Sequence, residues 1–309
     1  MRRVNENPAA RRAIVAAGAA VLLASAAVLY ATGHTVVPGS EDYRPGPVWR
    51  VWVPVVAAMV AIRLVPWHTP SGPVDERLRG KMRGRWPRLD LFVLVVCLLG
   101  FAAADPVLSS VLHMVSPVLT PLSYFLAKVF FLFLVPVMLV GAAGVLRYDT
   151  GPDLPRLSLW VSEAWRWGGL AAIAVYALVA VSPWAAQPPM AGTEVPDRFT
   201  AVLVITISLL SSPVLEEIFF RGMLQTRLEF VLGRWPGIVT ASLAYAVFSL
   251  VGGGLPNGLT VALAMTVCVQ GVAGVMYGYL WSRYRNMWLN VLLHSFITLL
   301  APVPLSFWG

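Results

Sequence analysis

Two adjacent carboxylates and an arginine close a long apolar run in this sequence. Glu216, Glu217 and Arg221 stand at the end of the run from Phe199 to Leu215. Ionisable groups are costly inside a bilayer, so such a cluster indicates a functional site there. On a helix, Glu217 and Arg221 are four residues apart and can pair, whereas the motif supplies no partner for Glu216. Because burial disfavours the charged form of an unpaired carboxylate, Glu216 is a candidate general base. The alternative is that the cluster marks only a helix end at the cytoplasmic interface.

A second set of polar residues lies in the last apolar segment of the chain. Asn290, His294 and Thr298 recur every four residues and therefore share one face of a helix. A polar stripe on an apolar span faces protein or a water-filled cavity rather than lipid. The stripe predicts either a catalytic face or a seam of hydrogen bonds between helices. The presence of Glu216 elsewhere in the chain favours the catalytic interpretation.

The elements that must position these residues are membrane helices. The chain has 309 residues, of which 58% are hydrophobic and only 12% charged, with a mean hydropathy of +0.73. A soluble domain has about a quarter of its residues charged. We therefore expect an all-α fold, a polytopic membrane helical bundle of about 8–9 transmembrane helices. The two cysteines, Cys97 and Cys268, lie in apolar runs and are predicted to be packed thiols rather than a disulfide or a metal pair.

Apolar runs of about 20 residues, the length that crosses a bilayer, set the candidate spans. They are 13–33, 50–66, 89–104, 120–146, 167–186, 199–222, 237–252, 259–282 and 286–307. If the N-terminus is cytoplasmic, the cytoplasmic segments hold eighteen basic residues and the outer segments three, which predicts an N-in, C-out topology. Arg63 and Lys128 fall near span ends, where long side chains can reach the interface.

The chain is predicted to have two parts. Residues 1–165 are predicted to form accessory N-terminal transmembrane helices, with a basic cytoplasmic loop at 67–89. Residues 166–309 are predicted to form the bundle that holds the polar motifs, whose core is 199–302. Contact with anionic lipid headgroups accounts for the basic loop, and we expect no nucleic-acid partner.

The motifs resemble those of a known family. Glu216-Glu217-x-x-x-Arg221, followed by Gly222-Met-Leu-Gln-Thr-Arg-Leu, resembles the first motif of the CAAX-protease and bacteriocin-processing (CPBP) family, the glutamate intramembrane proteases. The segment from Gly271 to Gly278 resembles that family's glycine-spaced helix. His294, with its leucine-rich approach, resembles the last motif. The resemblance covers roughly 199–302.

The resemblance implies a role for each residue. Glu216 would activate a water molecule, Glu217 and Arg221 would form a structural pair, and His294 would be the histidine of the last helix. The family's second motif is Phe-x-x-x-His and its last is His-x-x-x-Asn. In this sequence Tyr245 stands in place of the phenylalanine and Ser249 in place of the second-motif histidine. Thr298 replaces the asparagine. We expect Glu216, His294 and Ser249 to be catalytic, with Asn290, Thr298 and Tyr245 in support.

Three functions remain open from the sequence. The first is an intramembrane endopeptidase that cleaves a peptide or protein tail near the membrane. The second is a catalytically inactive relative that acts as a scaffold, because Ser249 cannot carry a positive charge as a histidine can. The third is a transporter that uses Glu216 and His294 as a proton relay. One histidine and two carboxylates are a poor zinc shell, so no metal and no cofactor are expected. The expected partners are membrane lipid and a peptide or protein substrate, in a plasma membrane of the bacterial type.

Overall fold

The computed structural model describes residues 8–37, 46–70, 72–83, 87–120, 122–140, 159–182, 184–185, 206, 209, 213–251 and 257–300. Regular structure in these residues is helical apart from β1 (Val36–Val37) and β2 (Gly46–Pro47), which pair antiparallel. The all-α prediction is therefore confirmed. Most of the predicted span 199–222 precedes residue 213 and, like the end of the last span, lies outside the described residues.

The helices follow the predicted spans closely. Residues 8–139 hold α1 (Pro8–Ala31), α2 (Trp49–Leu64), α3 (Gly72–Arg83), α4 (Pro87–Val115), η1 (Pro117–Leu119), α5 (Leu122–Lys128), η2 (Val129–Leu134) and α6 (Val135–Leu139). Residues 164–300 hold η3 (Ala164–Trp167), α8 (Leu170–Ala180), α10 (Leu215–Glu217), η5 (Ile218–Gln225), α11 (Thr226–Leu232), α12 (Arg234–Phe248), α13 (Gly258–Thr266), η6 (Val267–Gly271), α14 (Val272–Tyr284), α15 (Met287–Ser295) and η7 (Phe296–Leu300). Of these, η1 and η3 are 3-10 helices, whereas η2, η5, η6 and η7 are wider, π-helical stretches.

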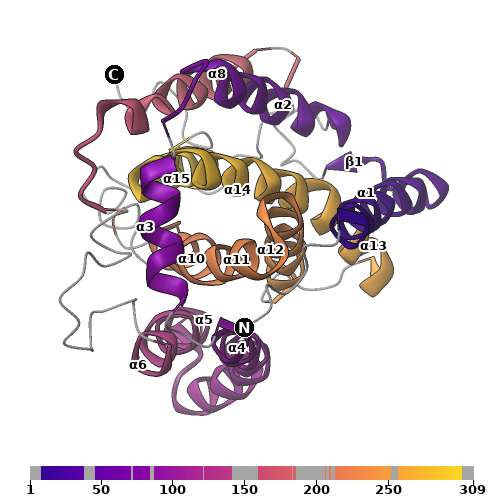
Figure 1. The fold of residues 1–309 in the computed structure, drawn as a ribbon. Coiled ribbons are helices and arrows are strands. Elements are labelled where there is room, and N and C mark those ends of the chain that lie inside the picture. Colours follow the sequence, from indigo (N-terminus) through magenta and orange to yellow (C-terminus); the bar gives the residue numbers. More distant parts are fainter. Residues whose placement is uncertain are drawn as a thin grey trace.

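Helix α14 lies at the centre of the bundle. Figure 1 shows α2 and α8 on one side of it and the α10–α12 segment on the other, with α4, α5 and α6 beyond that segment. Helices α1 and α13 pack together at one edge. Buried residues from α2, α4, α12, α14 and α15 form one continuous apolar core. The central helices are therefore shielded by the outer ones, and polar side chains on α14 and α15 can be held away from lipid.

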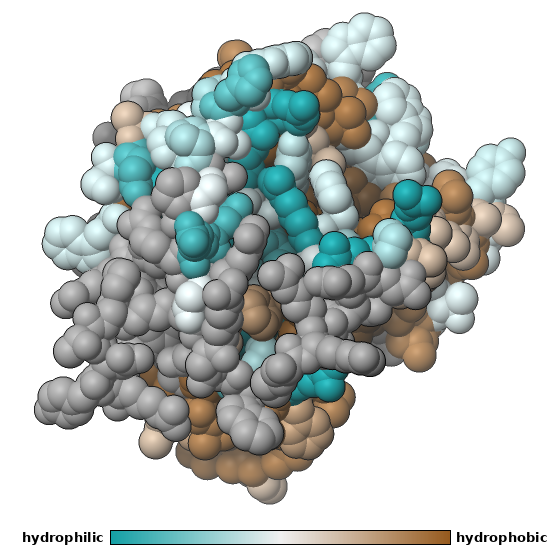
Figure 2. All heavy atoms as spheres, in the orientation of Figure 1, coloured by the Kyte–Doolittle hydropathy of each residue, from teal (hydrophilic) through white to brown (hydrophobic). Residues whose placement is uncertain are grey.

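Outer helices and the segment that contains α14 have the length and composition of membrane spans. Four helical segments of the described chain are long and apolar enough to cross a bilayer: Pro8–Ala31, Pro87–Val115, Leu122–Leu139 and Gly258–Tyr284. They expose large apolar side chains such as Leu23, Leu99 and Met138, a pattern that lipid accounts for and water does not. Figure 2 shows hydrophilic side chains gathered over the middle of one face, with apolar ones along its lower margin. The chain is an integral membrane protein.

Two details differ from the sequence prediction. The basic segment 67–89 is not a plain loop, because it contains α3, whose first turn holds the proline and acidic residue that favour a helix start, Pro73 and Asp75. Helix α4 continues to Val115, past the predicted end at 104 and through Pro106. Its Asp105 accepts a hydrogen bond from Ser123 Oγ (3.1 Å) on α5, so this carboxylate within the longer helix has a partner on a neighbouring helix. The predicted thiols are confirmed, because Cys97 and Cys268 are both buried and free.

The predicted N-in, C-out topology can be tested by cysteine labelling. In a background without Cys97 and Cys268, we expect a cysteine introduced at an exposed α3 position, such as Glu76, to react with an impermeant maleimide only after permeabilisation. A cysteine at the C-terminus should react in intact cells, because the excess of basic residues retains the other segments in the cytoplasm. Equal protection of both positions would show that one short span has been miscounted.

Candidate active site

The acidic motif lies on one continuous helical segment formed by α10, η5 and α11. In the π-helical stretch η5, the hydroxyl of Thr226 donates to the carbonyl oxygen of Arg221, five residues earlier (2.9 Å). π-helical turns are often found at functional sites, where they redirect side chains. The segment ends at Gly233, whose φ of +98° is a backbone conformation that favours glycine. The chain then turns into α12, which packs against α11.

Glu217 is completely buried and accepts hydrogen bonds from three side chains. Its Oε2 accepts from Arg221 Nε (3.3 Å) and from Asn290 Nδ2 (3.0 Å), and its Oε1 faces His294 Nδ1 (2.9 Å). Asn290 also donates to the carbonyl oxygen of Tyr277 (2.9 Å), which ties α15 to α14. A buried carboxylate is stable only when paired and hydrogen-bonded in this way. Glu217 therefore joins the motif helix to the last helix.

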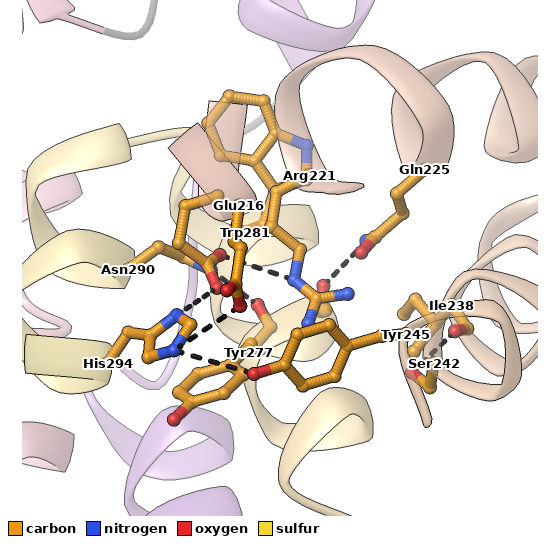
Figure 3. A network of polar contacts seen from close by, with 12 residues as sticks. Glu216, Arg221, Gln225, Ile238, Ser242, Tyr245, Tyr277, Trp281, Asn290 and His294 are labelled. Atoms are coloured by element: carbon orange, nitrogen blue, oxygen red, sulfur yellow. Dashed lines mark hydrogen bonds and ion pairs between the residues drawn. The ribbon is translucent and has the colours of Figure 1, made fainter. Parts of the chain in front are cut away.

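The contact with Glu217 also sets the orientation of His294. Because Nδ1 faces a carboxylate, we assign the ring proton to Nδ1, which leaves Nε2 as an acceptor in the neutral ring. Nε2 lies 3.4 Å from the Tyr245 hydroxyl and 3.7 Å from Glu216 Oε2. Figure 3 shows dashed contacts that join the imidazole to Glu216 and to the hydroxyl of Tyr245. The ring also stacks on Tyr277, with centroids 5.1 Å apart and planes at 20°.

Two tyrosines hold the guanidinium of Arg221. Its central carbon lies 5.3 Å from the ring centroid of Tyr245 and 5.5 Å from that of Tyr277. Such cation–π contacts are strongest where water is excluded, and Arg221 is fully buried. The arginine is thus fixed by its aromatic neighbours as well as by Glu217.

The structure corrects the prediction for Glu216 and Lys128. Glu216 does not lack a partner, because its Oε1 forms an ion pair with Lys128 Nζ, at the end of α5. Lys128 does not reach an interface, since its side chain is only 4% exposed. The motif itself contains no cation for Glu216, and the partner comes from a helix 88 residues earlier in the chain. Glu216 consequently lies between Lys128 on one oxygen and His294 on the other.

Ser249 and Thr298 are placed differently from the other predicted residues. The Ser249 hydroxyl donates to the carbonyl oxygen of Tyr245, one turn back on its own helix (2.9 Å), and no described contact joins it to Glu216 or His294. Thr298 is exposed and donates to the carbonyl oxygen of His294 (2.9 Å). The helix becomes π-helical at Phe296, directly after α15. Thr298 therefore does not lie on the buried face that holds Asn290 and His294.

Sequence reasoning missed Lys128 and Tyr277. Lys128 was detectable as a lone cation inside an apolar run, which is by itself a sign of function in a membrane span. Tyr277 lies in the glycine-spaced helix α14, whose role is close packing. A Cβ on Gly274 would lie 3.1 Å from Ser242 Cβ, and one on Gly278 would lie 2.8 Å from Gln225 Oε1. Small residues let helices approach in this way, and the approach brings Tyr277 against Arg221 and His294.

Part of the chain matches a known protein family. Residues 198–300 match the family model described as type II CAAX prenyl endopeptidase Rce1-like. The chain carries a CAAX-protease-family domain. This domain contains both carboxylates, Arg221, Tyr245, Tyr277, Asn290 and His294. Lys128 lies outside the matched residues. No curated protein and no solved structure matches the chain.

Proposed function

We propose that this protein is an intramembrane endopeptidase in which Glu216 activates the attacking water. The observation that carries the proposal is the position of Glu216 Oε2 3.7 Å from Nε2 of a histidine that a second carboxylate orients. The separation exceeds a direct hydrogen bond, yet one water molecule can contact both atoms. A general base must be within such reach of the proton that it removes.

The remaining contacts support a separate role for each residue of the site. Glu216 takes a proton from water as the water oxygen attacks the peptide carbonyl. His294 is held in one tautomer by Glu217, so its Nε2 can bind the water or, once protonated, donate to the leaving amine. Glu217 is already occupied by three donors, which suits a positioning role. Tyr245 supplies a hydroxyl next to Nε2.

The substrate that fits this location is a peptide or protein tail close to the membrane. Both carboxylates are nearly inaccessible to water from outside the bundle, and outer helices that are long and apolar enough to cross a bilayer expose large apolar side chains. A substrate must therefore approach along the membrane or from its surface. A prenylated tail, a bacteriocin leader and a C-terminal sorting tail all meet this requirement.

A specific observation favours a second candidate, an inactive relative that binds a peptide as a scaffold. Ser249 stands where the resemblance places a histidine, and its hydroxyl is engaged by its own helix. Loss of one donor to the oxyanion commonly lowers kcat by about 10²–10³-fold. The two candidates differ in whether another group in the site replaces that donor.

The experiment is cleavage of reporter peptides by the purified protein in liposomes. We expect cleavage of at least one of three membrane-anchored reporters, which carry a prenylated tail, a leader or a sorting tail. Ser249→His is expected to preserve or raise the rate, because an imidazole adds a donor that can carry charge. Binding of all three reporters without cleavage by either protein would favour the scaffold. Uptake of a reporter peptide into the same liposomes that depends on a proton gradient, and that Glu216→Gln abolishes, would instead indicate a transporter.

A further inference from the structure

Lys128 is a buried cation in the interior of a predicted span. It is the seventh residue of the helical segment Leu122–Leu139, or about 10 Å along a helix that rises 1.5 Å per residue. Its ammonium pairs with Glu216. A charged group at such depth is costly and usually marks a functional position.

The surroundings of the ammonium group link it to the part of the site that departs from the family pattern. Lys128 Nζ lies 4.4 Å from the ring centroid of Tyr124 and 5.7 Å from that of Phe248. Phe248 is the last residue of α12 and precedes Ser249, the position of the expected histidine. The ammonium therefore lies beside the end of α12, where the family pattern would place a second charged donor.

We propose that Lys128 is a catalytic residue that supplies the charged donor to the oxyanion in place of the second-motif histidine. The inference rests on the proposed endopeptidase function. A lysine ammonium carries three donors and a full positive charge. One donor can remain on Glu216 while another faces the carbonyl oxygen of a bound peptide.

The reaction step balances without any further reagent. The water oxygen forms a bond to the carbonyl carbon, Glu216 takes the water proton, and the carbonyl π electrons move to the oxygen. Lys128 stabilises that oxyanion by hydrogen bonding and charge, and transfers no proton. When the oxyanion re-forms the carbonyl group and the C–N bond breaks, the proton held by Glu216 passes to the amine nitrogen, directly or through Nε2 of His294. The products are a carboxylic acid and an amine, and Lys128 ends in its starting state.

A purely structural role for Lys128 makes a different prediction. If the lysine only neutralises Glu216, its removal favours the protonated carboxyl group, which cannot act as a base, so the lost activity returns as the pH is raised. If it contacts the oxyanion, kcat falls at every pH in protein that is still folded, while KM changes little, because the contact is formed in the transition state.

The test compares Lys128→Met, Lys128→Arg and a matched control, Ser123→Ala, in the liposome cleavage assay. Ser123 is buried on the same helix and donates its hydrogen bond to Asp105. We expect Lys128→Met to lower kcat by about 10²–10³-fold at neutral and at raised pH, with folded protein counted by size-exclusion and melting. Lys128→Arg should recover part of the loss, and Ser123→Ala should leave kcat close to that of the wild type.

Each other outcome overturns the inference in a recognisable way. Wild-type cleavage with an unchanged kcat in folded Lys128→Met would reject the role of Lys128 and leave the proposed function standing. A similar fall in Ser123→Ala would show that the loss comes from disturbing α5. Failure of the wild type to cleave any reporter would reject the endopeptidase, and the catalytic role of Lys128 with it.

Discussion

Glu216→Gln is expected to lower kcat for reporter cleavage by about 10²–10⁴-fold, the usual contribution of a positioned general base. The amide has nearly the shape of the carboxylate but cannot accept a proton from water at neutral pH. Its oxygen can still accept a hydrogen bond from Lys128, so substrate binding should persist. Cleavage kinetics in liposomes and binding of an uncleaved reporter measure the two effects separately.

The same substitution should also lower stability, because it leaves the buried Lys128 without its counter-charge. Breaking a buried ion pair from one side costs about 3–5 kcal/mol. The double variant Glu216→Gln with Lys128→Met removes both charges and should regain much of the melting temperature in detergent. It should remain inactive. Recovery of cleavage in the double variant would contradict the assignment of Glu216 as the base.

Glu217→Gln is expected to damage both folding and catalysis. Arg221 is completely buried and would lose its charge partner, at a cost of about 3–5 kcal/mol. The new amide can also turn its NH₂ group toward His294 Nδ1, which would force the ring proton onto Nε2. An amide in place of the carboxylate that orients a catalytic histidine lowers kcat by about 10⁴-fold in a well-studied hydrolase. A fall of that order, together with a lower melting temperature, is therefore expected here.

Asn290→Ala provides the graded control for Glu217→Gln. Asn290 carries no charge and donates one hydrogen bond to the same carboxylate oxygen, and the loss of a hydrogen bond to a charged group costs about 1.5–3 kcal/mol. We expect a smaller fall in melting temperature and a much smaller fall in kcat than for Glu217→Gln. Equal damage from the two substitutions, or a Glu217→Gln protein as stable as the wild type, would contradict the view that Glu217 organises the site.

The sequence predicted the membrane bundle well because its signals are local. Apolar runs of sufficient length identified α1, α2, α4 and α14 without knowledge of any partner helix. The interior of the site was also partly predictable. Glu217 and Arg221 are one helical turn apart, as are Asn290 and His294, and these spacings alone place each pair on one face.

Contacts between distant segments could not be predicted in the same way. Nothing in the acidic motif indicates that a lysine 88 residues earlier pairs with Glu216. The prediction that Thr298 shares a face with Asn290 and His294 was wrong, because a π-helical stretch follows Ser295 and changes the angular spacing of the residues. Such stretches have no simple sequence signal. The N-in topology and the division at residue 165 stay predictions.

The pairing of Lys128 with Glu216 has a consequence for how this protein can be cut or recombined. The family match begins at residue 198, so its limits include the acid but leave out the cation. A chimera that transplants only residues 198–300 onto another set of N-terminal helices would carry Glu216 into the bilayer without Lys128. A minimal transferable unit must therefore include α5 as well. The segment that matches the family model is shorter than the set of residues that pair around Glu216.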